Sequence, residues 1–191
     1  MWARVESNTI VEILTRPKAL TIGDTNYPSN IFELWDAGAL RALGIFPVLQ
    51  DNTNFKDKEY YINTNQTFTF ADNKVTASYG TATAKSLDDS GSGENLVKGL
   101  KTLKKEVINN QAGGILAPTD WMVIRAAEGG TSVPSSITTK RAAVRTKANS
   151  MCAQIDAASD VDALAALYVY TNTGTEENPV FTRPLGELPT V

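Results

Sequence analysis

The chain offers few residues that could do chemistry. It contains one cysteine, Cys152, and no histidine among its 191 residues. The lack of histidine excludes Ser-His-Asp and Cys-His catalysis, because both use imidazole as the general base. It also excludes zinc sites that contain histidine, and one thiolate cannot build a cysteine site. We therefore expect Cys152 to be a small apolar core residue; a contact between chains and surface exposure are the alternatives.

Carboxylates are the remaining route to enzyme chemistry. Asp88 and Asp89 lie in a Gly/Ser-rich stretch that would not fix their geometry, whereas Asp156, Asp160 and Asp162 surround an expected helix start. Acidic residues at a helix start favour the helix dipole and cap, which explains them without catalysis. We therefore expect no enzyme activity, no catalytic, cofactor-binding or metal-binding residues and no cofactor. A hydrolase or metal site built from carboxylates alone is the alternative.

Positive charge is sparse. The chain has 18 basic and 21 acidic residues, so its net charge is −3. That balance provides no electrostatic footprint for nucleic acid or anionic lipid. One basic run, Lys140, Arg141, Arg145 and Lys147, falls on one side of an expected helix. We expect it to be a solvated face, since a nucleic-acid contact would need aromatic partners or more charge.

The stretch 118–130 predicts a short helix that contains a tryptophan. Thr119 or Asp120 is the expected N-cap, and two glycines end the helix. We expect Trp121 to be a core anchor that fastens this helix to the one beginning near Pro134. The alternative is an anchor between subunits.

The first ninety residues favour β-structure. Residues 1–14 predict a hairpin with Ser7 and Asn8 in its turn, because asparagine tolerates positive φ. Residues 15–30 are an expected loop. A short helix is expected over 36–44, followed by a strand over 45–49. Pro47 lacks an N–H, so this strand should be an edge strand or a bulged one. Three further runs predict a small antiparallel meander: 59–64, 66–71 and 75–79.

The rest of the chain favours helices. The Gly/Ser-rich stretch 86–93 is the expected linker, with the boundary between lobes at about residue 90. The expected helices cover 94–112, 118–130, 134–157 and 159–168. The first of these has an apolar stripe at Leu96, Leu100, Leu103 and Val107. That stripe either packs on its own lobe or forms a self-association seam.

These elements predict an α+β protein in three parts. Residues 1–90 form a small N-terminal antiparallel β lobe of a hairpin plus a meander, and residues 91–170 form a helical lobe of three to four helices. Residues 171–191 are an extended C-terminal arm, either an assembly device or a disordered tail. The charged, alternating start is unlike a signal peptide. The longest apolar run, 163–169, is too short to span a bilayer. We expect a chain made in the cytosol that is soluble or built into something soluble.

Several segments, in their order along residues 1–168, resemble tail-associated proteins of tailed bacteriophages. The helical segments are similar to a C-terminal helical domain of those proteins, and the N-terminal ones to their opening hairpin and an "LGI-PV" segment. The matching segments are 1–6, 10–12, 43–48, 119–128, 133–145 and 164–168. Residues 56–89 and the final arm depart from the pattern.

The resemblance implies a structural component of the virion tail, made in the host cytoplasm. Its place would be the tail fibre, the baseplate or the fibre-attachment region. Its partners would be other tail, baseplate or fibre proteins in a homo- or hetero-oligomer, with no nucleic acid and no membrane insertion. Some relatives are tail fibre assembly chaperones that the virion does not retain, and this is the alternative.

Overall fold

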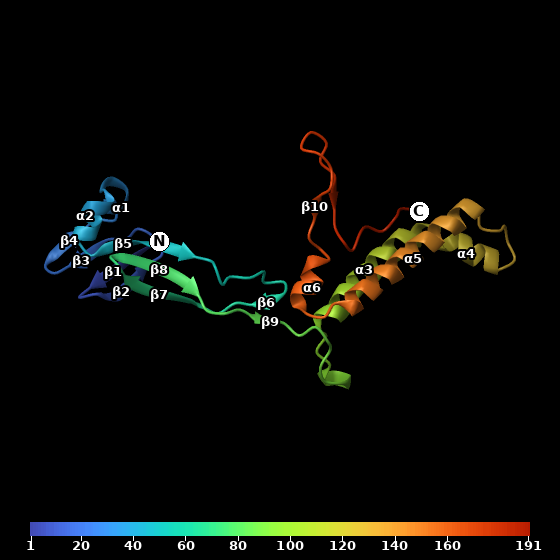
Figure 1. Cartoon of the computed structure of the whole chain (residues 1–191), viewed down its shortest axis with the longest axis horizontal. Helices are drawn as coiled ribbons and strands as arrows, with labels where there is room; N and C mark the ends of the chain where they lie inside the picture. Colours follow the sequence, from blue (N-terminus) through green and yellow to red (C-terminus); the bar gives the residue numbers. More distant parts are fainter. The chain divides into compact units, whose positions relative to one another are not determined.

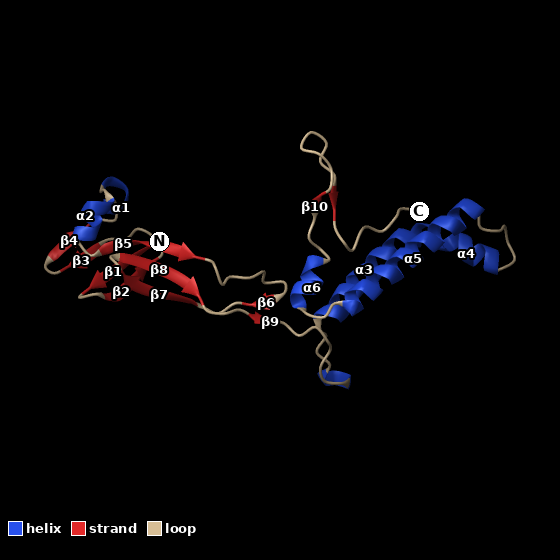
Figure 2. Ribbon diagram, in the orientation of Figure 1, coloured by secondary structure: helices blue, strands red, loops and turns tan.

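The computed structural model describes residues 1–191, which divide into two compact units, Met1–Thr83 and Ala84–Val191. Strands dominate the first unit and helices the second (Figure 2), and the α+β class is confirmed. The boundary falls at Thr83, against our expectation of about residue 90. Residues 171–191 belong to the second unit. No helix has both the length and the apolar character needed to cross a membrane.

The first unit is built around a five-stranded sheet with the strand order β2-β1-β5-β8-β7 (Figure 1). Two short pairs, β3 with β4 and β6 with β9, lie outside it. The bounds are β1 Trp2–Glu6, β2 Thr9–Leu14, β3 Leu20–Ile22, β4 Thr25–Tyr27, α1 Ile31–Leu34, α2 Ala37–Ala42, β5 Ile45–Asp51, β6 Tyr61–Ile62, β7 Gln66–Ala71, β8 Lys74–Tyr79 and β9 Thr83–Ala84.

Two tight turns set the hairpins of this sheet. Ser7 and Asn8 have φ of 48° and 62°, and Asp72 and Asn73 have φ of 49° and 57°. Two successive left-handed residues match the twist of the flanking strands. The predicted N-terminal hairpin is thus confirmed. The expected meander is a β7–β8 hairpin only, because the run 59–64 contributes β6, which pairs with β9 elsewhere.

The strand that contains Pro47 is central, so the expectation of an edge strand is wrong. Residues 45–47 pair antiparallel with β1, and residues 48–51 pair parallel with β8. Pro47 is the last residue of the first pairing and precedes the second. Its missing N–H therefore costs no bond to β8. The sheet is mixed, not wholly antiparallel, because of the β5–β8 pair.

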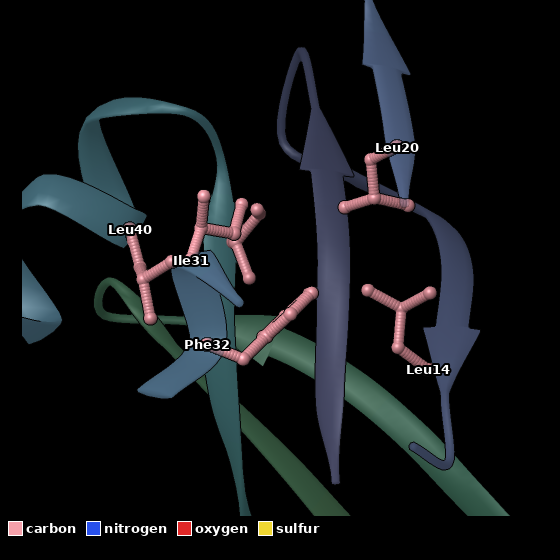
Figure 3. Close-up of a cluster of buried hydrophobic side chains, with 6 residues drawn as sticks. Leu14, Leu20, Ile31, Phe32 and Leu40 are labelled. Atoms are coloured by element: carbon pink, nitrogen blue, oxygen red, sulfur yellow. The ribbon is translucent and has the colours of Figure 1, made fainter. Parts of the chain in front are cut away.

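Successive residues of β5 point to opposite faces of the sheet, as strand geometry requires. Ile45 packs in one cluster with the helices α1 and α2, and Phe46 packs in the other cluster on Val75. Leu20 and Phe32 belong to the first cluster (Figure 3). They come from β3 and α1. The expectation of a plain loop over 15–30 is therefore wrong, because β3 and β4 form a hairpin that adds to the core.

The second unit consists of helices, a short C-terminal hairpin and a final segment. Its elements are η1 Gly93–Asn95, α3 Leu100–Leu116, η2 Ala117–Thr119, α4 Asp120–Ala127, α5 Ser135–Ala157, α6 Val161–Ala166, β10 Thr171–Asn172 and β11 Phe181–Thr182. The helices α3 and α5 pack side by side (Figure 1). The expected helices from Pro134 and Asp160 are confirmed, and the Asp160 carboxylate caps α6 by accepting a hydrogen bond from the Ala163 N–H at 2.8 Å.

The helix α3 begins at Leu100, six residues later than expected. The segment 86–89 supplies acceptors for its first turn, which has free N–H groups. The Leu100 N–H donates to the Ser86 carbonyl at 2.9 Å, and the Gly99 N–H donates to the Asp89 carboxylate at 2.7 Å. The expected linker is therefore part of the helix start.

The buried face of α3 is not the predicted stripe. Its buried residues are Leu100, Lys104, Ile108 and Ala112. They recur at spacings of four and lie toward α5, whose stripe of Val144, Ala148, Met151 and Ile155 is fully buried or nearly so. Leu96, Leu103 and Val107 are exposed. Lys104 is a charged residue within the buried face of α3, so this face could not be recognised from a continuous pattern of apolar residues.

The C-terminal arm lies on the helices of its own unit. Leu185 has no exposed surface. Its N–H donates to the Leu167 carbonyl at 3.1 Å, and its carbonyl accepts from the Lys147 ammonium at 2.9 Å. Before this point the chain forms the β10–β11 hairpin. The arm is thus ordered by packing, not extended throughout.

Candidate interaction surface

The helix α4 has eight residues and none of them is buried. Three of its large apolar side chains are exposed: Trp121 by 53%, Val123 by 42% and Ile124 by 57%. Trp121, Ile124 and Arg125 are three or four positions apart and therefore share a helix face. We name the three residues Trp121, Ile124 and Arg125 the α4 surface; Val123, two positions from Trp121, lies on another side of the helix.

A buried arginine on α5 holds the start of α4. Arg141 donates to the Leu116 carbonyl at 2.8 Å, to the Thr119 hydroxyl at 2.5 Å and to the Asp120 carboxylate at 2.6 Å. We expected Thr119 or Asp120 to cap the helix through its side chain. Thr119 makes no such cap: its hydroxyl donates to the Leu116 carbonyl at 2.9 Å and accepts from Arg141, and the Asp120 carboxylate accepts from Arg141. These bonds fix where α4 leaves α3.

Trp121 does not anchor the core, so that expectation is wrong. The Arg125 guanidinium lies 4.9 Å from the centroid of the Trp121 ring, in a cation–π contact. Polar bonds from Arg141, rather than the indole, join this region to α5. Trp121 is consequently left on the surface, and the alternative, an anchor between subunits, stays a prediction.

The α4 surface has the composition of a protein-binding site. Burying exposed apolar area stabilises a complex by roughly 25 cal/mol per Å². Contiguous exposed apolar side chains mark interaction sites in soluble proteins. Tryptophan and arginine are the residues most often found where binding energy concentrates. A partner that covered Trp121 and Ile124 would desolvate both side chains on a helix already held in place.

A second exposed apolar row lies on α3 and the loop before it. It consists of Leu96, Val97, Leu103 and Val107. Leu96, Leu103 and Val107 belong to the predicted stripe. The fourth residue of that stripe, Leu100, is buried. The side chains of the row are 45–64% exposed, and the self-association seam stays a hypothesis.

The basic run on α5 is not simply a solvated face. Arg141 is buried, and the Lys147 ammonium binds the Leu185 carbonyl. Lys140 and Arg145 are exposed. Two of the four residues, Arg141 and Lys147, therefore bind other parts of the chain.

The candidate carboxylates serve helix starts and ion pairs. Asp89 accepts from the Gly99 N–H and the Thr102 hydroxyl, which hold the pKa of its carboxyl below 3.8. Asp88 lies 3.5 Å from the Lys101 ammonium. The two carboxylates are adjacent in sequence but have different partners.

The second group of aspartates is also dispersed. Asp156 pairs with Lys105 at 2.7 Å. The Ala163 N–H, together with the Ser159 hydroxyl, lowers the pKa of Asp160. The buried charged side chains are lysine and arginine, not carboxylates. No three histidine, cysteine or acidic side chains lie where they could share a metal ion.

Cys152 is half-buried, and the core position beside it belongs to Met151. Its Sγ lies 3.9 Å from the Asn109 Oδ1. Burial raises the pKa of the thiol. The thiolate, which is the nucleophilic form, is therefore disfavoured.

The sequence did not reveal how Lys104 is buried. Its ammonium lies 4.3 Å from the centroid of the Tyr168 ring. A buried lysine usually needs such a partner. Leu100 and Ile108 are eight positions apart, which puts them on the same face of a helix. This spacing was the sign, in the sequence, of the buried face of α3.

No protein-family model, curated protein or solved structure matches this chain. The functional argument therefore depends on the α4 surface and on the segments that resemble phage tail proteins.

Proposed function

We propose that this protein is a structural component of a bacteriophage virion tail, located in the fibre, the baseplate or the fibre-attachment region. It acts by binding neighbouring tail proteins through the α4 surface. The resemblance of the segments described above supports the tail assignment. The chemistry of the α4 surface supports the mode of action.

The central observation is that Trp121 and Ile124 are exposed on a helix that Arg141 holds in place. Trp121 is 53% exposed and Ile124 is 57% exposed, so both have apolar surface left for a partner to bury. A fixed position lowers the entropy cost of binding a partner. The same residues lie within the segment 119–128, which contributes to the resemblance.

Mass spectrometry of purified, intact particles tests the proposed location. We expect the chain at a fixed copy number in virions. If infected cells contain the protein and purified particles lack it, the structural role is wrong and the assembly chaperone is favoured.

The proposed contact can be tested separately with Trp121→Ala and Ile124→Ala in the phage. Both variants should fold, yet incorporate into particles at least about tenfold less, as expected for residues that dominate an interface. Leu103→Ala is the matched control, because it removes an exposed apolar side chain from α3 instead. If Leu103→Ala blocks incorporation and the α4 variants do not, the contact lies on the α3 row.

A further inference from the structure

The first unit contains a hollow of about 520 Å³, lined by Phe55, Lys58, the residues 61–66 and Tyr79 at the end of β8. Its size falls within the roughly 300–1,000 Å³ of small-molecule sites. Three aromatic rings and three amides dominate its wall: Phe55, Tyr61, Tyr79, Asn63, Asn65 and Gln66. It lies in the part of the chain that departs from the phage proteins.

Hydrogen bonds fix the wall of this hollow. The Asn63 amide accepts from the Lys56 N–H at 2.8 Å and donates to the Lys56 carbonyl at 2.7 Å. The Thr64 hydroxyl accepts from the Gly80 N–H at 2.8 Å. The Asn54 amide donates to the Tyr79 carbonyl at 3.0 Å. The loop is thus held in shape without a ligand, which lowers the entropy cost of binding.

The aromatic side chains form an apolar wall in which Phe55 is exposed and Tyr61 and Tyr79 are half-buried. The ammonium groups of Lys56 and Lys58 lie 4.3 Å and 5.7 Å from the centroids of the Tyr61 and Phe55 rings. The rings of Phe55 and Tyr79 pack at 4.9 Å between centroids with an angle of 55° between their planes. Phe55 is 38% exposed, and Ile62 beside it is 60% exposed. Such a wall favours a ligand with an apolar C–H surface.

Two amides of the wall have hydrogen-bonding capacity to spare. Asn65 is exposed to solvent in the lining. Gln66 donates its Nε2 to the Gln50 Oε1 at 2.6 Å, which leaves its own Oε1 as an acceptor. A side-chain amide both donates and accepts. A ligand hydroxyl does the same, so amides and hydroxyls are matched partners.

We propose that this hollow binds a sugar ring of a glycan. A pyranose presents C–H bonds on its face and hydroxyls at its edge, which match the aromatic wall and the amides of Asn65 and Gln66. Lys58 is the one charged residue in the lining. Since canonical glycoside hydrolysis requires two carboxylates and the lining contains none, the site binds the sugar without cleaving it.

An array of neutral, uronate-containing and amino-sugar bacterial oligosaccharides, probed with the full chain, tests the proposal. We expect at least one to bind, with a dissociation constant below about 1 mM by calorimetry. Asn65→Ala and Phe55→Ala should each weaken that binding about tenfold or more. Asn65→Ala is the decisive variant, because Asn65 is exposed and its replacement should leave the fold intact.

Asn149→Ala is the matched control, since it removes an exposed amide from α5. It should leave the affinity unchanged. Lys58→Gln distinguishes the ligands, because it should weaken a uronate and spare a neutral sugar. The proposal is overturned if no oligosaccharide binds, or if Asn65→Ala binds as well as the unaltered chain. Neither result depends on whether virions contain the protein.

Discussion

The guanidinium of Arg141 lies 2.6 Å from the carboxylate of Asp120, and this ion pair joins α5 to the first residue of α4. The Arg141 side chain is 9% exposed, whereas that of Asp120 is 53% exposed. The pair therefore combines a desolvated cation with a solvated anion. Arg141 also satisfies the Leu116 carbonyl at the junction of α3 and α4.

Arg141→Ala should lower the free energy of unfolding of the second unit by about 1–3 kcal/mol, because it leaves the Leu116 carbonyl and the Thr119 hydroxyl without this donor. Urea unfolding followed by circular dichroism measures the change. Arg145→Ala removes an exposed arginine from the same helix and should change stability by less than about 0.5 kcal/mol. Equal losses in the two variants would contradict the role of Arg141.

Trp121→Ala should cost the isolated chain no more than about 1 kcal/mol, which is the worth of an exposed cation–π contact. The comparison is Ile108→Ala, whose side chain is buried between α3 and α5 and whose loss should cost about 2–5 kcal/mol. Thermal unfolding of both variants provides the measurement. A loss at Trp121 as large as that at Ile108 would mean that the indole is buried in solution.

Two glycine substitutions should change stability in opposite directions. A Cβ on Gly99 would lie 2.4 Å from the Leu87 carbonyl oxygen, so Gly99→Ala must displace the start of α3 and destabilise it. A Cβ on Gly113 would meet nothing within 4 Å, so Gly113→Ala should stabilise α3 by up to about 1 kcal/mol. Chemical denaturation distinguishes the two. Stabilisation by Gly99→Ala would place that residue inside the helix, as the sequence pattern suggested.

Leu185→Ala should release the C-terminal segment from its helices. The amide of Leu185, which is bonded to the Leu167 carbonyl, should then exchange its hydrogen about tenfold faster or more. Hydrogen exchange followed by NMR reports this amide directly. Val180→Ala removes an exposed side chain from the same arm and should leave the rate unchanged. An unchanged rate in Leu185→Ala would show that the arm is not held by this residue.

Asp89 should give the start of α3 a dependence on acid pH. Its folded pKa lies below the ordinary 3.8 because its carboxylate accepts from Gly99 and Thr102. A lowered folded pKa means that the stabilisation is present above the unfolded pKa and is lost as the pH falls through the folded value. NMR titration of the carboxyl carbon should show the low pKa. Asp89→Asn should abolish this part of the acid dependence; if it persists, another group is responsible.

Structural features that depend only on residues close together in the sequence could be predicted. Ser7 with Asn8 formed the expected tight turn, because asparagine tolerates a left-handed backbone. Asp160 capped its helix, because the carboxylate needs to reach only three residues along the chain. The buried stripe of α5 was also predictable, since a helix repeats its faces every 3.6 residues.

Features that depend on partners far along the chain could not be predicted in this way. Pro47 is tolerated in a central strand because β1 and β8 pair with different parts of β5. Leu185 is buried because α5 and the end of α6 lie beneath it. Neither arrangement can be recognised from the residue types of neighbouring positions in the sequence.

The candidate site shows the same division. That Trp121 lies on a short helix with a glycine end could be predicted, because propensity and turn signals act between neighbouring residues. That the indole faces solvent depends on the tertiary structure. Arg141, 20 positions beyond Trp121 in sequence, fastens α4 through polar bonds and leaves its apolar face uncovered. Burial depends on which segments meet, and that is a property of the whole unit.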